Sequence, residues 1–255
     1  MINISFIAAV LPVALLLIFI YRKDKYQPEP LGKLLLAFVA GCFCILPASI
    51  MEAVLMLFTP DDAVVDGIYT GYAVAGCSEE LCKLVLLMMV IWRSRHFDEF
   101  FDGIVYAVFV SLGFACVENI MYVTSNDDPV MIAFMRGILA VPAHFLFAVT
   151  MGYYVSLAKF DPLNKRSHLF KAFFYPMLLH GTYDALLMVS DALGSSSDDE
   201  DAVVALAIGI LTLVFIVFDI IMWRRGMKRI KRMQERSKEQ SFDRMHPFDG
   251  FRWDF

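Results

Sequence analysis

The sequence is short of charge for its length. Only 19% of its 255 residues are Asp, Glu, Lys or Arg, whereas 59% are hydrophobic, and the mean hydropathy is +0.62. Soluble globular domains carry about 25% charged residues and fewer apolar ones. The composition therefore argues against a soluble protein and is typical of a protein that crosses a membrane several times.

Several common functional signatures are missing as well. Neither HExxH nor GxxxxGK[ST] occurs, which argues against a zincin site and a P-loop nucleotide site. No internal repeat and no segment long enough for a separate soluble domain is present. No Lys or Arg precedes the first apolar stretch, so we interpret that stretch as a retained helix and not as a signal peptide. The five cysteines all fall within apolar stretches, so we do not expect a disulfide framework.

Long apolar stretches dominate what is present. Each is about 20 residues or more, which is enough for a helix to cross a hydrocarbon core of about 30 Å. The fold predicted is an all-α bundle of about seven membrane spans. The predicted spans are residues 3–21, 34–58, 67–92, 103–123, 130–158, 169–190 and 202–223.

The connections between these stretches separate by charge. Twenty of the 22 Lys and Arg residues lie in residues 22–33, 93–102, 159–171 and 224–255, and the other two are Lys83 and Arg136. Basic loops stay on the cytoplasmic side of a membrane, so we predict an external N-terminus and a cytoplasmic C-terminus. The basic tail adjoins a span and lacks interleaved aromatic residues. It therefore indicates contact with the lipid bilayer, and no nucleic-acid partner is predicted.

Four parts of the chain follow from this pattern. We expect two N-terminal spans with their loops in residues 1–66 and a four-span catalytic core in residues 67–190. Residues 191–223 are predicted to hold an outer acidic loop and the last span, and residues 224–255 the basic cytoplasmic tail.

Ionisable residues inside the predicted spans are the most informative feature. A charged side chain at the middle of a bilayer costs about 3 kcal/mol, so such residues normally face the interior of a bundle and carry function. Five of them lie at similar depth on four consecutive spans, and we expect them to meet in one buried layer. They are Glu79, Glu80, Glu118, His144 and His180.

Spacing along each helix refines this prediction. Glu79 and Lys83 are four residues apart, as are His180 and Asp184, so each pair shares a helix face. Glu80 is rotated by about 100° from Glu79, and we expect that it does not point at the same atom without a local distortion. One glutamate is then expected to act, with Glu79 favoured, while the other supports the site.

Carboxylates and imidazoles in one buried layer suit hydrolysis. A buried glutamate serves as a general base toward water. The histidines either bind a metal that acidifies water, with zinc or another divalent ion as the predicted cofactor, or stabilise an oxyanion. Asp184 is expected to fix the tautomer of His180. The same residues would also suit a proton- or ion-coupled transporter, although no inverted repeat is visible.

Several sequence blocks resemble those of PrsW-type intramembrane proteases, which belong to the CAAX prenyl protease superfamily, and they occur in the same order along the chain. The similarity covers about residues 67–190. The blocks are "EELCK" (Glu79, Glu80, Lys83), "FDGIVYA" from Phe101, "GFACVENIMY" from Gly113, the lone His144 and "HGTYD" (His180 to Asp184).

The resemblance implies endoproteolysis of a membrane-anchored protein in the bacterial cytoplasmic membrane, and thus a single-span protein substrate, in the PrsW case an anti-sigma factor cut during a stress response. Lys83 stands where the wider superfamily has Arg one residue later, and Glu118 stands where it has His. Both departures agree with the PrsW branch and make prenylated substrates a poor prediction.

Site residues follow from the resemblance and the spacing together. The predicted catalytic residues are the five buried acids and histidines, and the predicted metal ligands are Glu80, Glu118, His144 and His180. Supporting roles are expected for Lys83, Asn119, Asp184 and Asp102, although Asp102 also suits a helix N-terminus.

Overall fold

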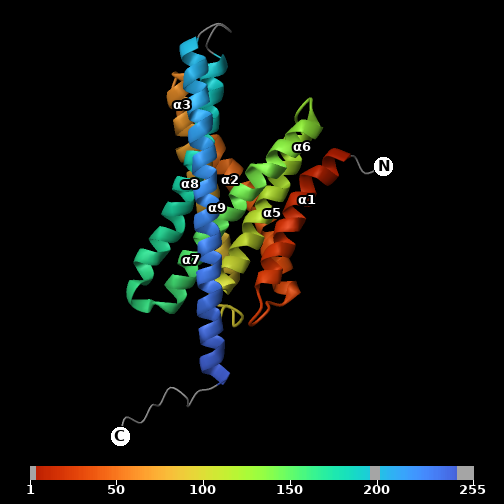
Figure 1. Cartoon of the computed structure of the whole chain (residues 1–255), viewed down its shortest axis with the longest axis vertical. Helices are drawn as coiled ribbons and strands as arrows, with labels where there is room; N and C mark the ends of the chain where they lie inside the picture. The colour runs from red at the N-terminus through yellow and green to blue at the C-terminus, as the bar shows by residue number, and fades with distance from the viewer. Residues whose placement is uncertain (1–3, 196–201, 246–255) are drawn as a thin grey trace.

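Helices account for the regular structure of the chain. The computed structural model describes residues 4–195 and 202–245, and these residues contain no strand (Figure 1). The predicted all-α membrane bundle is confirmed. Residues 196–201, which are most of the predicted acidic loop, and residues 246–255 of the basic tail lie outside the described residues.

The helices cover the predicted apolar stretches, but the stretch at 130–158 is divided between two helices, and the last helix continues past the predicted end at residue 223 to Met245. The helices are α1 (Ile4–Lys23), α2 (Leu31–Leu55), α3 (Ala63–Tyr69), α4 (Cys77–Ile91), α5 (Asp102–Thr124), α6 (Pro129–Ile138), α7 (Ala140–Phe160), α8 (Lys165–Ser195) and α9 (Ala202–Met245). A π-helical segment, η2 (Thr70–Gly76), joins α3 to α4, and short 3-10 turns η1 (Met56–Phe58) and η3 (Pro162–Asn164) lie in connections.

Five helical segments of the described chain are long and apolar enough to cross a membrane: Ile4–Lys23, Leu31–Phe58, Asp102–Thr124, Pro129–Phe160 and Ala202–Arg244. The other two predicted spans correspond to α3–η2–α4 and to α8. The first of these carries Glu79, Glu80 and Lys83, and the second carries His180 and Asp184. These polar side chains lower the hydropathy of the two segments. The number of spans and their direction across the membrane therefore stay predictions.

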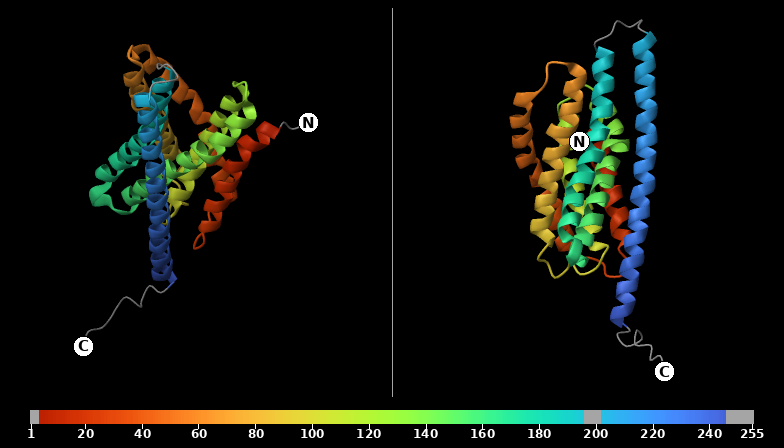
Figure 2. Two further views of the ribbon diagram at one scale, coloured as in Figure 1. Left: turned by 45° about the horizontal axis from the view of Figure 1, so that its top comes forward. Right: turned by 90° about the vertical axis from the view of Figure 1, so that its left-hand side faces the viewer.

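The connections gather at two ends of the bundle. The basic connections before α2, α5 and α8 lie at the end where α9 finishes, and the connection before α3 lies at the opposite end (Figures 1 and 2). This arrangement agrees with the charge pattern of the loops.

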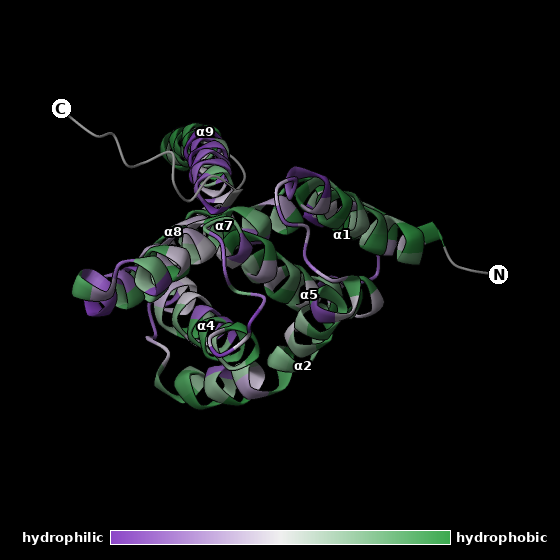
Figure 3. Ribbon diagram, turned by 90° about the horizontal axis from the view of Figure 1, so that it is seen from below, coloured by the Kyte–Doolittle hydropathy of each residue, from purple (hydrophilic) through white to green (hydrophobic). Residues whose placement is uncertain are grey.

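Burial separates central helices from peripheral ones. The apolar window of α5 is 78% buried, whereas that of α9 is 6% buried, and α9 lies at the edge of the bundle beside α7 and α8 (Figure 3). The outer helices expose large apolar side chains such as Leu35, Phe43 and Leu213. A continuous apolar exterior is what a lipid environment requires.

Small residues let the π-helical segment η2 approach α8 closely. A Cβ added at Gly71 would lie 2.7 Å from the Ala185 backbone nitrogen, and one added at Gly181 would lie 2.9 Å from Tyr72 Cα. π-helical turns are rare and occur frequently at functional sites. Here η2 ends at Gly76, three residues before Glu79, and its contact with α8 sets how near α8 comes to α4.

The close contact of η2 with α8 predicts that a larger side chain at Gly181 destabilises the protein. Gly181→Ala should lower the melting temperature of the detergent-solubilised protein, because overpacking a tight contact typically costs about 1–3 kcal/mol. Gly209→Ala is the matched control, since a Cβ on Gly209 meets nothing within 4 Å. Equal melting temperatures for the two variants would contradict the tight packing of η2 on α8.

Candidate active site

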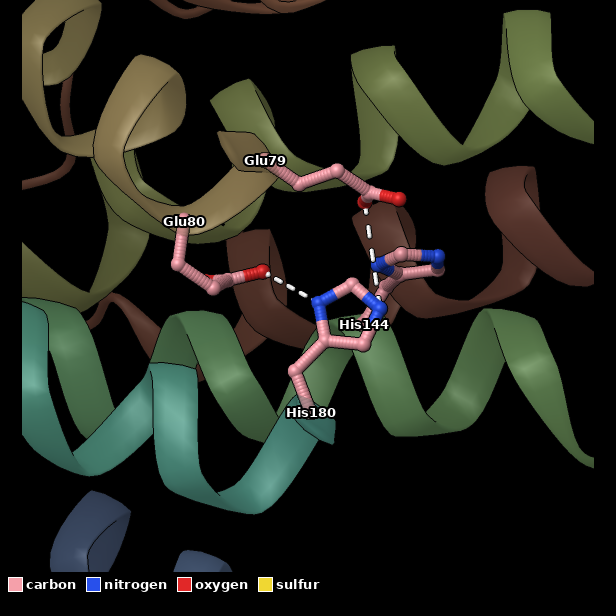
Figure 4. Close-up of side chains that lie close together, drawn as sticks. All are labelled: Glu79, Glu80, His144 and His180. Atoms are coloured by element: carbon pink, nitrogen blue, oxygen red, sulfur yellow. Dashed lines mark hydrogen bonds and ion pairs between the residues drawn. The ribbon is translucent and has the colours of Figure 1, made fainter. Parts of the chain in front are cut away.

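Four ionisable side chains converge between three helices. Glu79 and Glu80 project from α4, His144 from α7 and His180 from α8 (Figure 4). Each offers a nitrogen or oxygen atom, and these four atoms lie within 4.8 Å of one another. All four residues are buried. Residues up to 101 positions apart in the sequence thus form one polar cluster inside an apolar bundle.

Lys83 holds the two glutamates together. Its Nζ donates to Glu79 Oε2 and to Glu80 Oε1, both at 2.9 Å, and lies 3.2 Å from His144 Nδ1. The Phe114 ring covers the ammonium at 4.1 Å, a favourable cation–π distance. Lys83 is fully buried, so its positive charge compensates the two buried glutamates.

The predicted divergence of Glu79 and Glu80 is wrong. Both carboxylates reach the same Lys83 nitrogen, although α4 is α-helical throughout. The physical reason is that Lys83 stands three residues after Glu80 and four after Glu79, so its long side chain lies between them.

His180 is fixed from both sides of its ring. Its Nδ1 lies 3.0 Å from Glu80 Oε1, and its Nε2 lies 3.2 Å from Asp184 Oδ2 and 3.9 Å from Glu79 Oε2. The predicted pairing of His180 with Asp184 on one helix face is confirmed. Phe147 stacks on the imidazole with ring centroids 4.7 Å apart, which restricts ring rotation further.

A second ion pair borders the cluster. Glu118 Oε2 lies 2.9 Å from His144 Nε2 and 2.8 Å from Arg136 Nη2. Arg136 also donates from Nε to Asn119 Oδ1 at 2.8 Å, and Asn119 donates to the Ala9 carbonyl at 2.8 Å. Asn119 therefore reaches the site through Arg136, which itself compensates Glu118.

Asp102 and Glu118 lie outside the group of four mutually close donors. Asp102 does not join the cluster: its Oδ2 accepts from the backbone N–H groups of Asp98 and Glu99, at the end of the bundle where α5 begins. Glu118 contacts His144 but is not one of the four mutually close donors. Glu79 belongs to that group, although Glu118 and not Glu79 was among the predicted metal ligands. Sequence depth did not show that His144 separates Glu118 from α4.

A cavity of about 350 Å³ adjoins the cluster. Its polar lining consists of Glu79, Glu118, Arg136, His144, His180 and Asp184, and apolar side chains such as Phe147 and Leu187 complete the wall. Phe147 and Tyr122, whose ring lies 3.9 Å from the Arg136 guanidinium, were not foreseen. Both share a helix face with a predicted residue, Phe147 with His144 and Tyr122 with Glu118, and that spacing could have indicated them.

The cluster also fits a metal ion by its donor chemistry. Two imidazoles and two carboxylates are ligand types that catalytic zinc uses. Glu80 Oε2 is buried and has no hydrogen-bond partner among the described residues, so it offers a free acceptor beside the histidines. Lys83 Nζ lies within 3.2 Å of three of the four donor residues, Glu79, Glu80 and His144.

Comparison with known proteins identifies the family. Residues 29–222 match the model of a family described as PrsW family intramembrane metalloprotease. The chain belongs to this family. The predicted resemblance is thereby confirmed.

Curated relatives match between 71% and 93% of the chain. A protein named Protease PrsW from Clostridioides difficile is 33% identical over 93% of this chain and 94% of its own length. Relatives of the same name from Oceanobacillus iheyensis and Bacillus subtilis are 34% and 36% identical, over 89% and 71% of this chain and 95% and 81% of their own lengths. No solved structure matches.

Family membership and the apolar helices together define the class of protein. The chain is an integral membrane protein and an intramembrane protease, as predicted. The family is described as a metalloprotease, and the Glu79, Glu80, His144 and His180 cluster could bind a metal. A membrane protease of this kind works in a lipid bilayer on a membrane protein.

The buried ammonium gives a stability prediction. Lys83→Met should destabilise the protein by about 3–5 kcal/mol, because it leaves buried carboxylates without their counter-charge. Lys231→Met is the matched control: Lys231 also pairs with a glutamate four residues away, Glu235, but at 3.8 Å and on the exposed surface.

Exposed ion pairs contribute little, so Lys231→Met should leave the unfolding midpoint nearly unchanged. Unfolding of both variants in detergent by titration with dodecyl sulfate measures the difference. A Lys83→Met protein as stable as Lys231→Met would contradict the compensating role of Lys83.

Proposed function

We propose that this protease hydrolyses a peptide bond of a single-span membrane protein in the cavity beside Glu79, with an anti-sigma factor in the bacterial cytoplasmic membrane as the substrate that the resemblance implies. The observation that carries the proposal is the convergence of two carboxylates and two imidazoles on one buried cavity. A polar cavity in an apolar bundle provides space for the water that hydrolysis within a membrane requires.

Glu79 is the general base in this proposal. It lines the cavity, whereas Glu80 is fully buried against Lys83 and His180. Lys83 lies 2.9 Å from Glu79, so it favours the ionised carboxylate that accepts a proton from water. Glu79 takes this proton as the water oxygen attacks the scissile carbonyl carbon, and then gives it to the leaving amine. Glu80 positions His180 and Lys83.

Glu80, His144 and His180 would hold a zinc-like divalent ion. Glu118, the fourth ligand predicted from the sequence, is left out of this set because it is not one of the mutually close donors. Such an ion, when bound, lowers the pKa of water and polarises the carbonyl. Glu118 then orients His144 from its other ring nitrogen, as Asp184 orients His180. Arg136 compensates Glu118 at the cavity wall.

Cleavage in reconstituted vesicles tests the assignment. The purified protein is reconstituted with a tagged single-span bacterial substrate, and product formation is compared with Glu79→Gln, Glu80→Gln, His144→Ala, His180→Ala and Glu118→Gln. Glu79→Gln should lower the rate by about 10²- to 10⁴-fold, since that is the typical contribution of a general base.

The control for charge removal is Glu235→Gln, an exposed glutamate on α9 that should leave the rate unchanged. Folding of each variant is checked by its melting temperature. Cleavage that survives all five changes would overturn the assignment of the site. A larger loss with Glu80→Gln than with Glu79→Gln would reverse the roles of the two glutamates.

Metal content tests the cofactor separately. We expect about one equivalent of zinc or another transition metal in the purified protein, reversible loss of activity with a chelator, and a lower metal content in His180→Ala. Mass spectrometry of the digested protein measures the content. Full activity with less than about a tenth of an equivalent would exclude the metal-dependent form of the mechanism.

A further inference from the structure

A second cluster of acidic side chains lies where α5 begins, apart from the cluster at Glu79. Asp24 and Glu29 belong to the connection between α1 and α2, Glu99 to the connection between α4 and α5, and Asp102 is the first residue of α5. All four residues are at least 95% buried. Buried acids normally have a basic partner, since an uncompensated charge away from water is costly.

Some oxygens of this cluster organise the local backbone. Asp102 Oδ2 accepts from the N–H groups of Asp98 and Glu99 at 2.9 and 2.7 Å, and Asp24 Oδ2 accepts from the N–H of Glu29 at 2.9 Å. The Tyr106 hydroxyl donates to Glu29 Oε2. These bonds fix the side chains in place before any ligand is considered.

Four other oxygens of these acids have no hydrogen-bond partner among the described residues. Asp24 Oδ1, Asp102 Oδ1 and both carboxylate oxygens of Glu99 are buried without a hydrogen bond among residues 4–195 and 202–245. Buried polar atoms are nearly always satisfied in folded proteins. Four unpartnered oxygens in one place therefore point to a ligand that accepts electron pairs.

No Lys or Arg of the described chain forms an ion pair with these four acids. A neighbouring ion pair joins Arg244 Nη1 to Asp98 Oδ2 at 3.2 Å, where both side chains are more than 40% exposed. Burial raises the pKa of Glu29 and of Glu99 to about 7 and that of Asp24 to about 6. Loss of contact with water is the main cause of these shifts, and neighbouring acids raise the pKa of Glu29 and of Glu99 further.

We propose that Asp24, Glu99 and Asp102, with Glu29 and Asp98 beside them, form a second cation site that takes a hard divalent ion such as Ca²⁺ or Mg²⁺. One oxygen from each of the first three lies within 4.8 Å of the others, and the same holds for Glu29, Asp98 and Asp102. Ions of this class prefer carboxylate oxygens, and opposite ligands of Ca²⁺ are about 4.8 Å apart.

The ligand types distinguish this site from the cluster at Glu79. It contains oxygen donors alone, whereas the other cluster includes two histidines, which favour transition metals. The cation would join the α1–α2 connection to the α4–α5 connection. The second of these already contacts α9, because Phe101 N–H donates to Ser237 Oγ at 2.9 Å and Gln240 donates to the Asp98 carbonyl at 3.0 Å. The ion would therefore hold the two connections together at the end of the bundle where they contact α9.

Thermal unfolding with added ions tests the site. Metal-depleted protein in detergent is measured with a chelator, with Ca²⁺ and with Mg²⁺. At least one ion should raise the melting temperature by several degrees at saturation, because a ligand that binds only the folded chain stabilises it. Glu99→Gln should abolish the rise. Asp24→Asn, which keeps an oxygen for the Glu29 N–H, is the second variant should Glu99→Gln fold poorly.

Terbium luminescence, excited through aromatic side chains, measures binding directly with a Ca²⁺ substitute. Wild type and His180→Ala should bind alike, since His180 belongs to the other cluster, whereas Glu99→Gln should lose binding. Glu235→Gln controls for loss of a carboxylate on the surface. The proposal would be overturned in favour of a protonated cluster by two results together. Neither ion would shift the melting temperature of the wild type, and Glu99→Gln would be more stable than the wild type in chelator. An ion response that Glu99→Gln and Asp24→Asn both retain would overturn it too.

Discussion

The contact of Lys83 with Glu79 and Glu80 is the interaction on which the rest of the site depends. Two carboxylates in the interior of an apolar bundle are costly without a counter-charge, and Lys83 Nζ supplies it at 2.9 Å from both. The lysine adopts this position because α4 places it one turn after the glutamates. The histidines of α7 and α8 then meet a preformed group of acceptors and a buried cation.

The neighbouring helices extend the same principle. Arg136 of α6 compensates Glu118 of α5, and the two ion pairs border His144 from opposite ring nitrogens. Glycines at the contact of η2 with α8 let His180 come within 3.0 Å of Glu80. The site is therefore built from several helices, each of which contributes one or two polar side chains to an interior that is otherwise apolar.

The cluster at Glu79 and the cluster at Glu99 differ in how their charge is compensated. Around Glu79 the protein supplies its own ammonium, so the carboxylates stay available for chemistry in a buried position. Around Glu99 the described chain supplies hydrogen bonds for the backbone, but its one basic neighbour, Arg244, pairs with Asp98 and with none of the four buried acids, so an external ion is the counter-charge that we propose. One cluster thus suits catalysis and the other suits the fixing of connections.

Much of this arrangement was predictable from local rules. Helical spacing correctly paired Glu79 with Lys83 and His180 with Asp184, and apolar length correctly indicated a helical bundle. Spacing along one helix did not reveal that a long lysine side chain reaches two adjacent glutamates. Nor did it reveal the π-helical segment, which depends on packing against α8. Asp102 was grouped by its sequence motif, whereas its place at the start of α5 puts it in the other cluster.

The dependence of the site on Lys83 is tested most directly by the free energy of unfolding of the triple variant Glu79→Gln/Glu80→Gln/Lys83→Met. Removing all three charges together leaves no uncompensated group, so this variant should recover most of the stability that Lys83→Met alone loses. A triple variant as unstable as Lys83→Met would show that Lys83 stabilises the bundle through packing and not through its charge.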